Sequence, residues 1–124
     1  MEQVRKILVI DDEPDVVSYL SAFLEDEGFQ VLTASNGPDG IALAREQAPD
    51  LITLDITMPG MSGIEVLTTL RRDERLNGLP VVIITGVTSF DKLTDYRDVR
   101  APEGFMQKPI DLVRLLSMIK GILD

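Results

Sequence analysis

Three carboxylates, one hydroxyl and one ammonium group in this sequence could do chemistry together. They are Asp11, Asp12, Asp55, Thr85 and Lys108, and each stands at the end of an apolar run. Oxygen donors without nitrogen or sulfur suit Mg²⁺ or Mn²⁺. A carboxylate can attack phosphorus when a metal ion and a lysine neutralise the phosphoryl oxygens. The set therefore indicates phosphoryl transfer to a carboxylate.

Each of these residues also has an ordinary structural interpretation. Asp12 could cap a helix and Asp55 could form a turn. Thr85 could be a plain strand residue, and Lys108 a solvated lysine at a strand end. Because each side chain falls at the end of a different predicted strand, their joint occurrence favours the functional interpretation.

The residue types missing from the sequence narrow the chemistry further. With no histidine, the chain cannot use an imidazole as nucleophile, general base or metal ligand. With no cysteine, it has neither thiol chemistry nor disulfides. A phosphohistidine donor would have to come from another protein, or be replaced by a small acyl phosphate.

Length and charge indicate the class of protein. The 124 residues fit one domain over 1–124, with 44% hydrophobic and 27% charged residues. A net charge of −9 repels phosphate backbones, so we expect no nucleic acid binding by this domain alone. The sequence has neither a signal peptide pattern nor 18 consecutive apolar residues. We therefore expect a cytoplasmic protein that does not enter a membrane.

The elements that must position the reactive residues follow from hydrophobic patterning. Apolar runs rich in β-forming residues predict strands at 6–10, 29–34, 51–54, 81–85 and 104–107. Several runs are continuous rather than alternating, which is typical of strands covered on both faces. Helical patterns predict helices at 14–27, from about 38 to 47, from 62 onward, between 89 and 99, and over 111–123.

Local signals mark several helix boundaries. Pro14 suits a first helical position, Glu13 is predicted as a helix-start residue beside it, and Gly28 ends the pattern. The "SGIE" stretch at 62–65 has the spacing of a capping box. The second helix is predicted to turn its "IAL" stretch at 41–43 inward.

Five alternations of strand and helix predict an α/β fold with a doubly wound, five-stranded parallel sheet and five helices. In such folds, ligands bind at the carboxyl ends of the strands, beside the point where the strand order switches. The five reactive side chains are expected to meet at that edge.

The sequence resembles the receiver domain of two-component response regulators over essentially its whole length. The motifs that carry the resemblance are "VIDDEP" at 9–14, "LDITMPGMSG" at 54–63, "IITG" at 83–86 and "MQKPID" at 106–111. The resemblance implies a flavodoxin-like sheet of order 2-1-3-4-5. It also implies a signalling phosphoacceptor, rather than an ordinary enzyme, that catalyses its own phosphorylation and autodephosphorylation.

The resemblance further implies a role for each site residue. Asp55 would be the phosphoacceptor, and a histidine kinase or a histidine phosphotransfer protein would phosphorylate it. Asp12, Asp55 and the main-chain carbonyl of Thr57 would bind Mg²⁺, and Asp11 would hold a metal-bound water.

The resemblance also implies a conformational switch. Thr85 would hydrogen-bond the phosphoryl group and Lys108 would pair with it, while Phe105 would turn inward as Thr85 moves. The phosphoryl group would thereby shift a two-state equilibrium that controls contacts with a downstream protein.

The sequence departs from the family pattern in two places. Gly86 replaces the alanine that commonly follows the switch hydroxyl, and "RAPEG" at 100–104 replaces a turn of small residues. Glycine adds backbone freedom beside Thr85 and would loosen the switch. The face formed by the fourth helix, the fifth strand and the last helix is therefore the part that the resemblance describes least.

Two other functions stay open at this point. One is a metal-dependent phosphohydrolase that passes through a phosphoaspartate, although the position two residues after Asp55 is Thr57 rather than an acid. The other is a receiver-shaped interaction module that is never phosphorylated. The intact set of acids, hydroxyl and lysine favours the phosphoacceptor.

Overall fold

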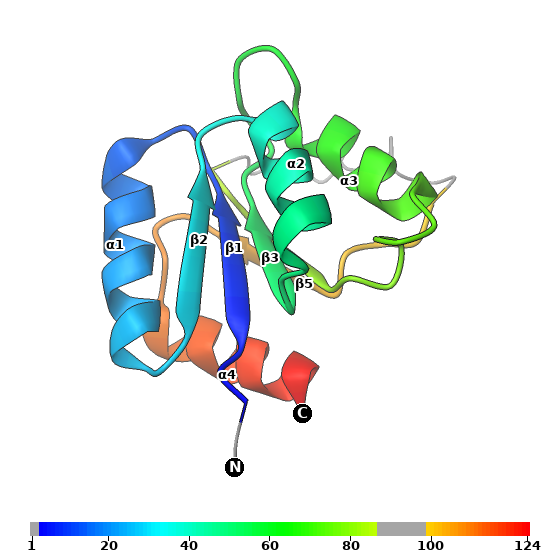
Figure 1. The fold of residues 1–124 in the computed structure, drawn as a ribbon. Helices are drawn as coiled ribbons and strands as arrows, with labels where there is room; N and C mark the ends of the chain where they lie inside the picture. Colours follow the sequence, from blue (N-terminus) through cyan, green and yellow to red (C-terminus); the bar gives the residue numbers. More distant parts are fainter. Residues whose placement is uncertain (1–2, 87–98) are drawn as a thin grey trace.

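A five-stranded parallel sheet forms the centre of the structure, a computed structural model that describes residues 3–86 and 99–124 (Figure 1). The strands run in the order β2-β1-β3-β4-β5, which confirms the predicted order. Their bounds are Lys6–Ile10 (β1), Gln30–Ala34 (β2), Leu51–Leu54 (β3), Val81–Thr85 (β4) and Gly104–Gln107 (β5). All four neighbouring pairs are parallel.

Helices in the described part of the chain follow four of the five predicted patterns. They are α1 (Pro14–Asp26), α2 (Gly37–Gln47), α3 (Gly63–Arg72) and α4 (Leu112–Leu123). The helix predicted between 89 and 99 lies outside the described residues, apart from Val99. None of the described helices has the length and apolar character needed to cross a membrane.

Side-chain caps fix the starts of α2, α3 and α4, the last through Asp111 Oδ1, which accepts from the Arg114 amide at 3.1 Å. Ser62 Oγ accepts a hydrogen bond from the Glu65 amide at 3.2 Å, as the capping-box spacing predicts. Asn36 Oδ1 accepts from the Asp39 amide at 2.8 Å, so α2 begins at Gly37, directly after this cap.

The end of α1 explains why β2 starts one residue later than predicted. Gly28 has a φ of +94°, a left-handed conformation that glycine adopts without strain. The next amide, of Phe29, then donates to the Leu24 carbonyl at 3.0 Å. Phe29 therefore belongs to the helix cap, and β2 begins at Gln30.

Two apolar layers cover the sheet, one on each face. Alternate strand residues face opposite sides, so Leu8 and Ile10 pack with α2 and α3, whereas Ile7 and Val9 pack with α1 and α4 (Figure 1). This two-sided burial is the physical reason for the continuous apolar runs in the sequence.

One inward-facing residue of α2 was predicted wrongly. Ala42 is exposed, whereas Ile41 and Ala44 are buried and Leu43 is partly buried against the same core. Successive residues of a helix are turned by about 100°, so residues three apart share a face while Ala42 turns away from it.

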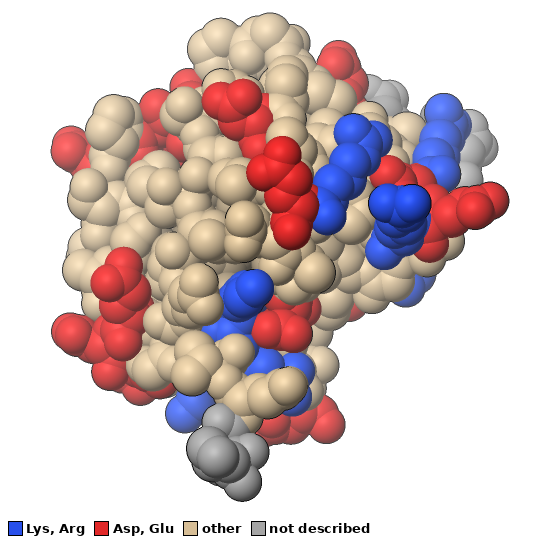
Figure 2. Space-filling model, viewed as in Figure 1, with Lys and Arg blue, Asp and Glu red and all other residues tan. Residues whose placement is uncertain are grey.

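Acidic side chains are spread over the face shown in Figure 2, and basic side chains form two groups, one toward α3 and one near the start of β1. Acidic groups interrupt the basic ones, so the described residues present no unbroken basic patch on this face.

A buried arginine ties α3 to the beginnings of β4 and β5. The Arg71 side chain is 2% exposed. Its guanidinium donates to the carbonyl oxygens of Leu79 (2.6 Å), Arg100 (3.1 Å) and Ala101 (3.3 Å) and to Glu103 Oε1 (2.7 Å). Burial lowers the pKa of Arg71, and the hydrogen bond and charge of Glu103 act in the opposite direction. The planar fork of donors thus satisfies four acceptors at once.

The same network accounts for the unusual "RAPEG" turn. Glu103 Oε1 also accepts from the Val81 amide at 2.7 Å, and Glu103 Oε2 lies 3.1 Å from Arg100 Nη2. The turn therefore supplies two main-chain carbonyl groups and one carboxylate to the arginine, and a turn of small residues would lack the carboxylate.

We expect Arg71→Leu to lower the free energy of unfolding by about 2–4 kcal/mol, because it leaves three carbonyl oxygens without this donor and removes an ion-pair partner of Glu103. Arg72→Leu is the matched control: Arg72 is exposed, and its loss should change stability by less than about 0.5 kcal/mol. Urea unfolding measures both. Equal midpoints for the two variants would contradict the role assigned to Arg71.

Candidate functional site

The hydrogen-bond ladder of the sheet continues one residue beyond β1 and β3. The Asp11 amide donates to the Ala34 carbonyl at 3.1 Å, and the Asp55 amide donates to the Ile10 carbonyl at 3.0 Å. The backbone of both aspartates is therefore fixed by the sheet, and their side chains emerge at the same edge.

Gly63 lets α3 approach the Asp55 backbone closely. Its amide donates to the Ile56 carbonyl at 2.9 Å. A Cβ at this position would lie 2.6 Å from Ile56 Cα and closer still to the Asp55 carbonyl oxygen. Only glycine fits here without moving the strand end that carries Asp55.

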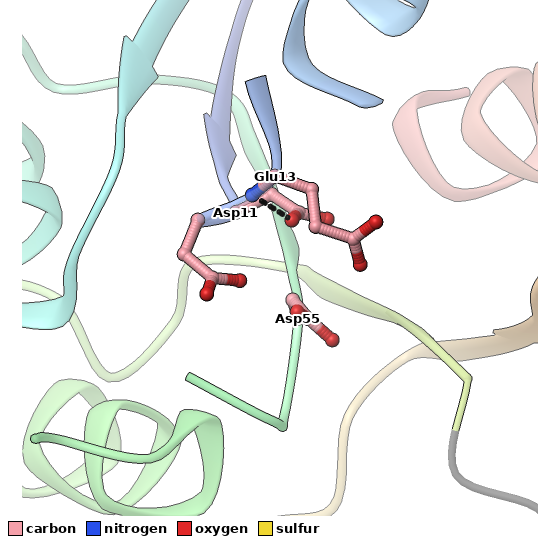
Figure 3. Close-up of side chains that lie close together, drawn as sticks. Asp11, Glu13 and Asp55 are labelled. Atoms are coloured by element: carbon pink, nitrogen blue, oxygen red, sulfur yellow. Dashed lines mark hydrogen bonds between the residues drawn. The ribbon is translucent and has the colours of Figure 1, made fainter. Parts of the chain in front are cut away.

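Four carboxylates gather at this edge. Asp11, Asp12, Glu13 and Asp55 each offer an oxygen, and these oxygens all lie within 4.8 Å of one another. Asp11 and Asp55 are buried, at 2% and 3% exposure, whereas Asp12 is partly buried and Glu13 exposed. Figure 3 shows the side chains of Asp11, Glu13 and Asp55 reaching into one space beyond β1 and β3.

This donor set fits a hard divalent cation. All its ligand atoms are carboxylate oxygens, and the chain has no histidine or cysteine to favour a softer metal. A hollow of ≈ 380 Å³ opens beside the cluster, and it is lined by Asp12, Glu13, Asp55, Thr57, Gly86 and Lys108. The hollow gives a metal ion or a phosphoryl group access from solvent.

Lys108 brings an ammonium group into the cluster. Its Nζ lies 2.8 Å from Glu13 Oε1, 3.2 Å from Asp11 Oδ2 and 3.8 Å from Asp55 Oδ2. The Lys108 amide donates to the Thr85 carbonyl at 2.8 Å, which holds the end of β5 beside β4. Desolvation lowers the pKa of Lys108, but the carboxylates outweigh it, and the pKa is raised.

Burial and like charge weaken the acidity of the two buried aspartates. Burial, together with the charge of Asp11, raises the pKa of Asp55 to about 6. Lys108, the Thr57 amide and the Thr85 side chain act against this shift. Burial also raises the pKa of Asp11. Both shifts follow from placing like charges where water is largely excluded.

The other predicted residues lie around Asp55. The Thr57 amide donates to Asp55 Oδ1 at 3.4 Å. Thr85 is fully buried, and its side chain hydrogen-bonds Asp55. Phe105 pairs with Ile83 in the sheet register and packs, partly buried, against the core shared with α2 and α3. The structure therefore places Phe105 below the carboxylate edge rather than in it.

Two features of the site were not predicted from the sequence. Glu13 precedes α1 as predicted, but its side chain makes no capping hydrogen bond and instead binds Lys108, 95 positions away. Gly63 was placed only within a capping box, and its approach to Asp55 was missed. Among the described residues, nothing lies within 4 Å of where a Cβ on Gly86 would stand.

The chain is similar to known proteins over nearly its whole length. The family profile of the response regulator receiver domain matches residues 7–120. Protein PilH of Pseudomonas aeruginosa is 39% identical over 122 residues, which cover 97% of this chain and 98% of PilH. The transcriptional regulatory protein PhoP of Bacillus subtilis, named for alkaline phosphatase synthesis, is 35% identical over 96% of this chain. The chain spans nearly all of PilH but only 48% of PhoP.

Solved structures of chemotaxis and receiver domain proteins are similar to this chain over nearly its whole length. The chemotaxis protein CheY4 of Vibrio cholerae has a TM-score of 0.88 at 29% identity, covering 97% of this chain and 99% of that chain. A CheY-like receiver domain protein of Methanospirillum hungatei has a TM-score of 0.90 at 26% identity, covering 98% and 95%.

We expect the buried charge of Asp55 to make the metal-free protein less stable as the pH rises. The folded protein holds the Asp55 proton with a pKa of about 6, above the usual 3.8. Between these values the folded state binds more protons than the unfolded chain, so stability falls as the pH rises through this window. Asp55→Asn should therefore exceed the wild type in stability by about 1–3 kcal/mol at about pH 7.5, and by much less at about pH 4.5.

Urea unfolding of both proteins in the presence of a chelator measures this difference. Using the difference cancels the titration of the carboxylates that do not interact with Asp55. Parallel pH profiles for the two proteins would show that the folded state does not raise the pKa of Asp55.

Proposed function

This chain belongs to the family of response regulator receiver domains, and from that premise we propose that it accepts a phosphoryl group on Asp55. The observation that carries the proposal is the position of Asp55: a buried carboxylate at the carboxyl end of β3, beside two further aspartates and one lysine. Membership of this family identifies the chain as a signalling phosphoacceptor. The roles of the individual residues are part of the proposal.

Asp55 acts as the nucleophile of this reaction. A carboxylate oxygen of Asp55 forms a bond to phosphorus, and the bond between phosphorus and the donor breaks. The proposed donor is a phosphohistidine. Since this chain has no histidine of its own, that group must belong to a histidine kinase or a phosphotransfer protein. The imidazole that leaves keeps the bonding electrons and takes up a proton.

Asp11, Asp12 and Asp55 are the residues that would hold Mg²⁺, with the main-chain carbonyl of Thr57 as a further ligand; Mn²⁺ fits the same donors. Bound there, the metal supplies charge neutralisation for the carboxylates and for the phosphoryl oxygens. The oxygen-only donor set and the burial of two of its aspartates support this assignment.

Thr85 and Lys108 recognise the phosphoryl group. The Thr85 side chain already hydrogen-bonds Asp55, and Lys108 Nζ is 3.8 Å from Asp55 Oδ2. A phosphoryl group with nearly two negative charges would draw both side chains toward it. The shift of Thr85, with inward rotation of Phe105, would convert phosphorylation into a change of the protein-binding surface, in a cytoplasmic signalling pathway.

Two observations disfavour the alternative functions. A phosphohydrolase would need a general acid near the phosphoaspartate, and the residue two positions after Asp55 is Thr57. Loss of the phosphoryl group would then be autodephosphorylation by water. An interaction module that is never phosphorylated would have no reason to keep three acids, a threonine and a lysine together at one edge.

We expect Asp55→Asn to abolish labelling by a small radioactive acyl phosphate in the presence of Mg²⁺, because the amide is not a nucleophile toward phosphorus. Asp39→Asn is a suitable control, since Asp39 is an exposed acid of α2 that makes no contact with Asp55 among the described residues. Undiminished labelling of Asp55→Asn would refute the assignment of the phosphoacceptor.

We also expect millimolar Mg²⁺ to raise the melting temperature, because the ion binds the folded cluster and not the unfolded chain. At a concentration 100 times the dissociation constant, the gain would be about 2.7 kcal/mol. Asp12→Asn should reduce the gain, whereas the control Asp39→Asn should not. Thermal unfolding followed by circular dichroism measures the effect, and an unchanged melting temperature would count against the metal site.

A further inference from the structure

Lys108 lies closer to Glu13 than to Asp55. Its Nζ is 2.8 Å from Glu13 Oε1, within hydrogen-bond distance, but 3.8 Å from Asp55 Oδ2, which is beyond it. The ammonium group that should engage a phosphoryl group on Asp55 therefore contacts Asp11 at 3.2 Å and, more closely, Glu13, a residue with no assigned part in the phosphorylation chemistry.

Glu13 is held in a position that favours this contact. Its amide donates to Asp11 Oδ1 at 2.9 Å, and Pro14 directly after it begins α1 (Figure 3). These two restraints fix the backbone of Glu13 beside the cluster. Since the side chain does not cap the helix, it is available to Lys108.

The other two carboxylates near Lys108 have different functions under the proposal above. Asp11 and Asp55 would help to hold the metal, and a divalent cation on them would repel the ammonium group. Glu13 is the partner that Lys108 can keep while the metal enters. Glu13 also lies on the solvent side of the cluster, with its side chain 59% exposed.

Exposure makes the contact weak enough to be exchanged. Ion pairs in contact with solvent change equilibria by only about 1.5- to 5-fold. A phosphoryl group with nearly two negative charges, partly shielded from water, is a stronger partner for Lys108. The geometry therefore suits temporary holding rather than permanent fixation.

We propose that Glu13 is a positioning residue that holds Lys108 Nζ away from Asp55 until a phosphoryl group arrives. This role rests on the proposed function. Glu13 and the phosphoryl group then compete for the same ammonium group, so Glu13 sets how strongly Lys108 engages the phosphorylated site.

Binding of fluoroberyllate, a tetrahedral mimic of a phosphoryl group, at saturating Mg²⁺ tests this competition by calorimetry. Glu13→Gln should tighten binding by about 1.5- to 5-fold, the range expected for loss of an exposed ion pair. Glu13→Asp keeps the charge but shortens the side chain, so it should shift binding in the same direction. Asp15→Asn, which removes an exposed charge from the first turn of α1, should have less than half the effect of Glu13→Gln.

Each outcome bears on a different claim. If the wild type fails to bind fluoroberyllate, the proposed function is refuted, and the role of Glu13 with it. If the wild type binds but Glu13→Gln does not bind more tightly, or Glu13→Asp behaves as the wild type, only the role of Glu13 is refuted. A loss of Mg²⁺ affinity of more than about tenfold in Glu13→Gln would make Glu13 a metal ligand, which also refutes the holding role.

Discussion

Repulsion among carboxylates at the edge of the sheet is the constraint on which the site depends. The parallel ladder fixes the backbone of Asp11 and Asp55 next to one another, and both side chains are almost fully buried. One ammonium group serves the whole cluster among the described residues, which leaves an excess of negative charge. A fold that concentrates negative charge in this way gains affinity for cations at a cost in stability.

The remainder of the structure keeps that edge in place. Apolar layers on both faces of the sheet hold the strands in register, so the strand ends cannot separate to relieve the repulsion. Gly63 adds a second restraint, because α3 begins against the backbone of Asp55 itself. The carboxylate that should react and the helix that follows it are thereby packed as one unit.

Much of the fold and most of the site could be predicted from the sequence. Burial on both faces leaves long apolar runs, and four of the five strands have the bounds that those runs predicted. The reactive residues were found because strand ends are visible in sequence and parallel strands bring their carboxyl ends together. The strand order itself came from the family resemblance, because patterning alone does not specify it.

Contacts that depend on long side chains could not be predicted in the same way. Arg71 has the sequence context of a solvated arginine near the end of a helix, and its four acceptors come from segments up to 32 residues away. Glu13 looks like a helix-start residue, and only the folded chain brings Lys108 to it. The error at Ala42 has another origin, because a short apolar stretch does not by itself define which side of a helix faces the core.

The network around Arg71 also determines how β5 can move. The beginning of this strand is fixed to β4 and α3 through Glu103 and the carbonyl groups just before it. The far end carries Lys108, whose side-chain contacts are exchangeable. Both ends of this four-residue strand are therefore tied to β4, one through Glu103 and the other through the Lys108 amide. When Lys108 changes partners, its side chain can move while the backbone of β5 keeps its register with β4. The exchange of partners is thereby confined to the chemical site.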